Sequence, residues 1–293
     1  MVLESIITPK TARRNPIAMI ILGILYAVIA IVLGYFIFPS DPSLSIIFLT
    51  SLAALPLMIN VLVQEEEEDI EYLKSKKMPL IKDHMDVFYD FAFLFTGFFI
   101  CFLIAYIFLP DSYAKLFFEK QIETIESILG PNGFFSSTMK VVSAEEGFKI
   151  ILVNNFKVLL FAILFSFLYG AGAIFILAWN SSILSVAMGN FIKTKLITIS
   201  QVTGITLLTN YFQVSSLGLL RYLIHGIPEL SAYFFGAVAG GIISAAVIRR
   251  DYKDPRFYDI LLDSLDLIAL ASLLLIIGAL LEVSVTPWII GWV

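Results

Sequence analysis

Long uncharged runs of apolar residues alternate with short charged segments along most of the chain. The runs Pro16–Phe38 and Ser43–Val63 contain no charged residue at all. About 20 helical residues, each rising about 1.5 Å, are enough to cross a hydrocarbon core of about 30 Å. We therefore predict membrane-spanning helices and expect the lipid bilayer to be a partner of this protein.

The same pattern predicts seven spans, which we place near 16–38, 43–63, 88–109, 150–178, 196–219, 226–248 and 265–287. The span at 196–219 is rich in Thr and Ser and contains Gly204. We leave open whether it crosses fully or is broken or re-entrant, which requires that protein covers its backbone. The predicted fold class is an all-α polytopic transmembrane helical bundle with six or seven spans.

Three parts follow from this arrangement. Residues 1–110 form a three-span N-terminal part with a cytoplasmic acidic and basic loop at 64–87, residues 111–149 form an extracytoplasmic loop, and residues 150–293 form a second membrane domain.

The extracytoplasmic loop contains its own helix signal. Apolar residues recur there at helical spacing, at Phe118, Ile122, Ile125 and Leu129. This stripe predicts an amphipathic helix that lies on the membrane or on the bundle. A capping box at 143–146 then predicts the start of a helix that continues unbroken to about Trp179.

The distribution of basic residues sets the expected orientation, because cytoplasmic loops are enriched in Lys and Arg. With the N-terminus in the cytoplasm, the inner segments hold 13 of the 19 basic residues: Lys10, Arg13, Arg14, Lys74, Lys76, Lys77, Lys82, Lys193, Lys195, Arg249, Arg250, Lys253 and Arg256. We expect a multi-pass protein of the cell membrane with a cytoplasmic N-terminus.

Composition narrows the chemistry. Apolar residues make up 59% of the chain and charged residues 15%. The single cysteine, Cys101, excludes an intrachain disulfide and a cysteine-based metal site, and two histidines exclude a His-rich metal cluster. We expect no cofactor, no metal and no nucleic-acid partner.

Polar and ionisable residues inside the late spans are the candidates for function, since such groups are costly in lipid and need a partner or a purpose. They are Asn154, Asn155, Asn210, Arg221, His225, Glu229 and Glu282. The seven-span topology places all of them in the same outer third of the membrane. They are expected to form either an interhelical polar clamp or a binding site for an ion, a proton or a lipid headgroup.

The segment around Pro228 has a local explanation of its own. Proline suits the first position of a helix, and Glu229 would then lie in the first turn, where the helix dipole favours a carboxylate. In the same span Gly236, Gly240 and Gly241 are spaced to let two helices approach closely. We interpret them as helix-packing residues and leave a pore lining or a homo-oligomer contact open.

Several of these elements together resemble the stage II sporulation protein M family. They are Asn154-Asn155, the segment 180–189, His225-Gly226-x-Pro228-Glu229, the glycines of the sixth span, and Glu282 with Thr286-Pro287. The resemblance covers residues 145–290. It implies a membrane protein that is not an enzyme, because bacterial members hold peptidoglycan-degrading partners at the membrane during engulfment.

The expected function is therefore a non-enzymatic integral membrane scaffold or assembly component, with a membrane or extracytoplasmic protein as partner. The alternative is a small transporter or permease for an ion, a proton or a lipid-like substrate, which would use the span near Gly204 and the intramembrane carboxylates. An intramembrane hydrolase is the third hypothesis. The sequence gives it little support, because the chain has neither HExxH spacing nor a nucleophile elbow.

Overall fold

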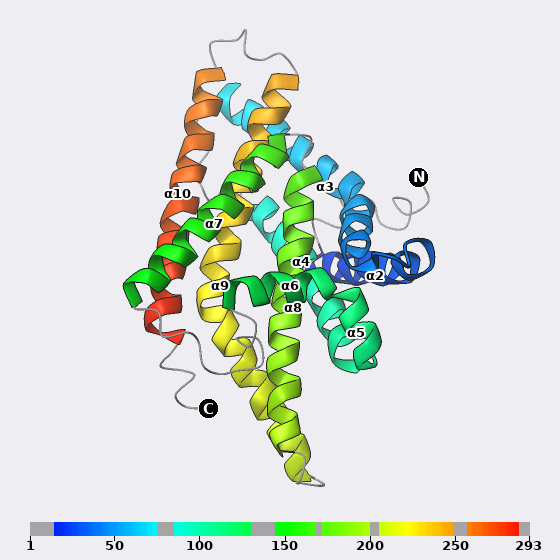
Figure 1. The fold of residues 1–293 in the computed structure, drawn as a ribbon. Helices are drawn as coiled ribbons and strands as arrows, with labels where there is room; N and C mark the ends of the chain where they lie inside the picture. Colours follow the sequence, from blue (N-terminus) through cyan, green and yellow to red (C-terminus); the bar gives the residue numbers. More distant parts are fainter. Residues whose placement is uncertain are drawn as a thin grey trace.

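The computed structural model describes residues 15–74, 85–129, 144–167, 171–199, 205–248 and 257–286. The regular elements in these ranges are all helices: α2 (Pro16–Ile37), α3 (Pro42–Lys74), α4 (Met85–Phe108), α5 (Asp111–Phe117), α6 (Glu119–Leu129), α7 (Ala144–Phe167), α8 (Ala171–Ile199), α9 (Ile205–Ile248) and α10 (Phe257–Ser284). Figure 1 shows α9 between α10 and α8, with α7 crossing obliquely over it.

Seven helices of the described residues are long and apolar enough to cross a membrane, namely α2, α3, α4, α7, α8, α9 and α10. The predicted all-α polytopic bundle is thus confirmed, and the chain is a multi-pass membrane protein. The first two spans form a hairpin, in which α2 and α3 pack against each other and are joined by a short turn at 38–41. Asn15 caps α2, accepting hydrogen bonds from the amides of Ile17 and Ala18 at 3.1 and 3.3 Å.

The predicted unbroken helix from residue 143 to Trp179 is wrong. α7 ends at Phe167 and α8 begins at Ala171, and each contains a candidate span of its own, Glu145–Ser166 and Ile174–Thr194. The sequence between the two helices contains Gly170, and glycine is among the poorest helix formers. The apolar run predicted as one span, residues 150–178, thus contributes to two spans, one in α7 and one in α8.

The segment 196–219 is divided between two helices, so its interpretation as a full crossing is wrong, whereas the broken alternative was left open. Its first residues end α8, and its later residues begin α9, whose candidate span is Tyr222–Ser244. Gly204 lies outside the described residues. The 17 residues of α9 before Tyr222 extend about 25 Å beyond that span. Figure 1 shows the ends of α8 and α9 projecting together past the rest of the bundle, and we call this part the α8/α9 hairpin.

Because α8 is itself a span, its C-terminal end lies on the side of the membrane expected to be outer, whereas the segment 193–195 is predicted on the inner side. Lys193 was expected on the inner side, but its Nζ lies 2.9 Å from Oδ1 of Asp111, at the start of α5 in the segment expected outside. The same ammonium lies 5.0 Å from the ring centroid of Tyr106. Lys193 thus shares a side with α5, and Lys195, two residues further on, follows it.

The amphipathic helix predicted in the loop is confirmed as α6, and it lies on the bundle. Phe118, just before it, and Ile125 are buried. Gln121 is fully buried, where its Oε1 accepts a hydrogen bond from Ser43 of α3 at 2.8 Å and its Nε2 donates to Ser182 of α8 at 3.1 Å. One side chain thus connects α6 to two spans.

Candidate functional site

Polar side chains of α7, α9 and α10 meet in one region of the bundle. We call this group the polar cluster, and its members are Asn155, His225, Glu229, Glu282 and Thr286. α10 runs antiparallel to α9, and α7 packs against both (Figure 1). The structure therefore brings together four of the seven residues selected from the sequence and adds Thr286.

The link from α7 to α9 is a hydrogen bond. Nδ2 of Asn155 donates to Oε1 of Glu229 at 2.7 Å, and Asn155 is buried. Its neighbour Asn154 is exposed, because successive helical residues are about 100° apart and this rotation turns Asn154 out of the contact with α9. Of the paired asparagines, only Asn155 belongs to the cluster.

The link from α9 to α10 follows a spacing of four residues on each helix. Nδ1 of His225 lies 3.1 Å from Oγ1 of Thr286. Glu229 lies one turn after His225 on α9, and Gly278 lies two turns before Thr286 on α10. A Cβ placed on Gly278 would lie 2.7 Å from Cγ of Glu229, so Gly278 makes room for that side chain. Glu282 lies midway between Gly278 and Thr286, on the same face of α10, and its carboxyl group is near that of Glu229.

The explanation of Glu229 from a helix start is wrong. Pro228 lies inside α9, which begins 23 residues earlier at Ile205. Glu229 is therefore in the middle of a helix and receives no help from the helix dipole. A proline within a membrane helix is tolerated when neighbouring helices satisfy the backbone that it frees. The carboxyl group depends instead on the amide of Asn155.

Two other residues selected from the sequence, Asn210 and Arg221, also lie on α9, but at different distances from the polar cluster. Asn210 lies 19 residues before Glu229 on one unbroken helix, about 28 Å away along its axis, so it does not join the cluster. Arg221 lies four residues before His225 and eight before Glu229, hence on the same side of α9. The side chains of Asn210 and Arg221 are outside the described set.

The glycines of α9 pack against α7. A Cβ on Gly236 would overlap Cδ1 of Leu159, and one on Gly240 would lie 2.6 Å from the carbonyl oxygen of Ile163. Gly241 is buried in the same helix. This close approach brings the backbones of α7 and α9 together beside the cluster and lets a short side chain such as Asn155 reach Glu229.

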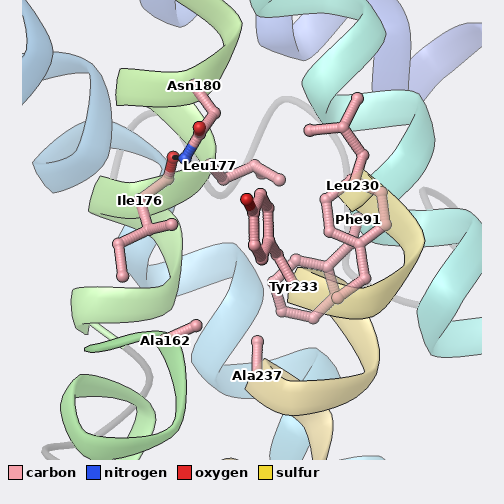
Figure 2. Close-up of a pocket in the computed structure, with 9 residues that line it drawn as sticks. Phe91, Ala162, Ile176, Leu177, Asn180, Leu230, Tyr233 and Ala237 are labelled. Atoms are coloured by element: carbon pink, nitrogen blue, oxygen red, sulfur yellow. Dashed lines mark hydrogen bonds between the residues drawn. The ribbon is translucent and has the colours of Figure 1, made fainter. Parts of the chain in front are cut away.

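A small cavity of about 10 Å³ lies beside the cluster, and Figure 2 shows the ring of Tyr233 standing in it. Its walls are mainly apolar: Phe91, Ala162, Ile176, Leu177, Asn180, Leu230, Tyr233, Phe234 and Ala237. A space of this size holds about one water molecule. It does not accommodate a hydrated ion or an organic substrate.

The cluster offers two carboxyl groups, one imidazole, one amide and one hydroxyl. Within the described ranges no three His, Cys, Asp or Glu side chains are grouped so that they could hold a metal ion. The arrangement can hold helices in register through hydrogen bonds, and it can hold or pass a proton. Site selection overlooked the member Thr286 and the neighbouring Gly278, which makes room for Glu229; their spacing of four from Glu282 is the signal that would have found them.

One comparison with known proteins gives a match. The family model described as stage II sporulation protein M matches residues 90–287. This range begins within α4, whereas the resemblance noted in the sequence begins at residue 145. No curated protein and no solved structure matches the chain.

Proposed function

Because the chain belongs to the stage II sporulation protein M family, we propose that it is a non-enzymatic scaffold of the cell membrane. In this proposal the bundle holds one or more membrane or extracytoplasmic proteins. Their contacts are on the side that carries α5, α6 and the α8/α9 hairpin. The polar cluster fixes how α7, α9 and α10 pack beneath that surface.

The observation that carries this proposal is the pairing of the intramembrane polar groups. Asn155 is bonded to Glu229 and His225 to Thr286, each across two helices, and the cavity beside them has a volume of only about 10 Å³. A carrier of this size needs a polar cavity that leads from its binding site toward one face of the membrane. The pairing of these groups across helices, with only a small and mainly apolar cavity nearby, favours a structural clamp.

The geometry of Thr286 supports a role without catalysis. Its hydroxyl and His225 are within reach of each other, as a nucleophile and a base would be. However, Thr286 is only 5% exposed, and its hydroxyl also lies 3.5 Å from the carbonyl oxygen of Leu281. A substrate would have to separate α9 from α10 to reach it.

One observation favours the alternative, a permease for protons or small cations. Glu229 and Glu282 are interacting carboxyl groups inside the membrane, and intramembrane carboxylates commonly mark proton and ion pathways. In the alternative, α9 and α10 would move apart to admit the ion. The two functions therefore predict different results for conservative changes at Glu229.

Ion flux separates the two functions. The purified full chain is reconstituted in liposomes that contain a pH-sensitive dye, and a proton gradient is imposed with and without K⁺ or Na⁺. We expect the same slow leak for the wild type and for Glu229→Gln. A flux that the wild type shows and Glu229→Gln lacks would overturn the scaffold in favour of the permease.

Contact with other proteins is tested by a photo-crosslinking residue introduced in native membranes. Gln213 and Ser216 are exposed on the α8/α9 hairpin, and Leu273 is exposed on the apolar part of α10. We expect discrete products of defined mass at Gln213 and Ser216 and none at Leu273. Products at none of the three positions would contradict a scaffold that binds through the hairpin.

The orientation belongs to the same proposal. With α8 as a span, the side of the N-terminus holds eleven of the 19 basic residues: Lys10, Arg13, Arg14, Lys74, Lys76, Lys77, Lys82, Arg249, Arg250, Lys253 and Arg256. This excess supports a cytoplasmic N-terminus, because cytoplasmic loops are enriched in Lys and Arg. A cysteine at position 76 should then react only after the membrane is opened, since the native Cys101 is buried. Labelling in intact cells would reverse the topology.

A further inference from the structure

α7 presents two polar side chains outward, away from the bundle. Asn154 and Lys157 are both exposed, although they lie inside the candidate span Glu145–Ser166. Their neighbours Val153, Leu160 and Phe161 are exposed by 47, 54 and 49%. In the part of the chain that the structure describes, no side chain pairs with Lys157.

The depth of Lys157 makes this exposure costly. The charged Lys149 lies eight residues before it, about 12 Å along the helix axis, and Ser166 lies nine residues after it, about 14 Å. A lysine side chain reaches roughly 6 Å, from bonds of about 1.5 Å. The ammonium therefore does not reach either headgroup layer without thinning the bilayer, and a charge left in hydrocarbon is unfavourable.

The rest of α7 indicates a surface that is built to be covered. Only 17% of its span is buried within the bundle, the smallest share among the seven candidate spans of the described residues. Its inner face is fixed by Asn155 on Glu229 and by the close contact of Ile163 with Gly240. The outer face is thus held in one orientation while it has no partner in this chain.

We infer that this face of α7 binds a transmembrane helix of another membrane protein, and that the partner helix carries an Asp or Glu carboxylate at the depth of Lys157. We call it the α7 outer face, made of Val153, Asn154, Lys157, Leu160, Phe161 and Leu164. The inference rests on the proposed scaffold function and adds a second, intramembrane contact to it.

Charge complementarity is what selects this partner. A carboxylate accepts a charge-assisted hydrogen bond from the ammonium of Lys157, and the amide of Asn154, one turn away, can donate to its second oxygen. The flanking side chains then pack against an apolar helix. Phe161 and Phe165 are stacked with ring centroids 5.6 Å apart, which provides a firm surface for that contact.

A second copy of the chain fits this face less well. A two-fold dimer through α7 would place the two Lys157 ammonium groups side by side, because an isologous contact repeats the same surface. On α10 the exposed carboxylate of Asp266 directly precedes the uncharged run 267–281, so it lies at the edge of the apolar segment. Lys157 lies well inside its own span.

The test uses the full-length protein and a defined peptide. A synthetic Leu/Ala helix with Asp, Asn or Leu at its central position carries a donor dye, and the protein carries an acceptor on a cysteine at position 216. Both are reconstituted in phosphatidylcholine vesicles, and binding is measured by energy transfer. We expect the Asp peptide to bind roughly 3- to 30-fold more tightly than the Leu peptide, the range of interhelical polar contacts in membranes.

Two variants identify the residue responsible. Lys157→Leu should abolish the preference for the Asp peptide, whereas Lys149→Leu, which removes an exposed lysine near the outer end of the same helix, should keep it. Charge reversal provides a positive result, since Lys157→Glu should prefer a peptide with a central Lys. Equal binding of the three peptides, or an Asp preference that survives Lys157→Leu, would refute the inference.

The other occupants have their own signatures, and each of them overturns the inference. Donor- and acceptor-labelled copies of the protein test self-association. If energy transfer between them is lost in both Lys157→Leu and Asp266→Asn, the α7 outer face binds a second copy. Enrichment of phosphatidylglycerol around wild type but not Lys157→Leu, with no peptide preference, would assign it to lipid. Neither result changes the flux and hairpin crosslinking experiments, so the scaffold proposal is judged separately.

Discussion

The hydrogen bond between Asn155 and Glu229 is the contact on which the packing of α7 most directly depends. The substitution Asn155→Leu removes the amide and keeps a similar volume, so it adds little cavity cost. Interhelical hydrogen bonds in membranes contribute about 0.6 kcal/mol on average and about 1.7 kcal/mol at most. This bond is 2.7 Å long and buried, with a carboxyl acceptor, so we expect a loss of about 1 to 2 kcal/mol.

The adjacent residue provides the matched control. Asn154→Leu makes the same chemical change on the exposed face, where we expect no loss of stability in the isolated protein. The free energy of unfolding is measured in detergent for both variants, for Glu229→Leu, which removes the acceptor, and for the double variant Asn155→Leu with Glu229→Leu. A coupling energy near zero, or equal destabilisation by Asn154→Leu and Asn155→Leu, would refute the clamp.

Three further outcomes are expected. Gly97→Ala should lower Tm by several degrees, because its Cβ would overlap the carbonyl oxygen of Ile20 and lie 2.9 Å from Cα of Gly23 in α2, at a cost of about 1 to 3 kcal/mol. Gly226→Ala, with nothing within 4 Å, should be neutral or stabilising. The hydrogen bond and charge of Lys193 lower the pKa of Asp111 from its ordinary value of 3.8. The stabilisation from this ion pair is therefore fully present above pH 3.8 and is lost as the pH falls through the lowered pKa. Lys193→Gln should raise the pKa of Asp111, which an NMR titration measures. Glu282→Gln should leave Tm unchanged or slightly higher, since it removes a negative charge beside Glu229, and a large fall in a thermal melt would indicate a charged clamp instead.

The sequence by itself determined the features that depend on local pattern. Apolar length decided that α2, α3 and α4 could cross a bilayer, because the cost of exposing polar groups to lipid depends mainly on composition. The apolar spacing from Phe118 to Leu129 determined α6 in the same way. Scarce polar residues in the late spans indicated where helices would need to pair.

Only the tertiary structure decided which helix each apolar residue belongs to and which way each helix faces. The apolar runs 150–178 and 226–248 do not show by periodicity that α7 ends at Phe167 and α8 begins at Ala171, or that α9 continues through Pro228. The side of the membrane assigned to Lys193 followed from that division. Likewise Asn154 and Asn155 are chemically identical, and only the rotation of α7 against Gly236 and Gly240 puts one on Glu229 and leaves the other facing outward. Helix rotation is fixed by packing between segments distant in the chain, which a local pattern does not contain.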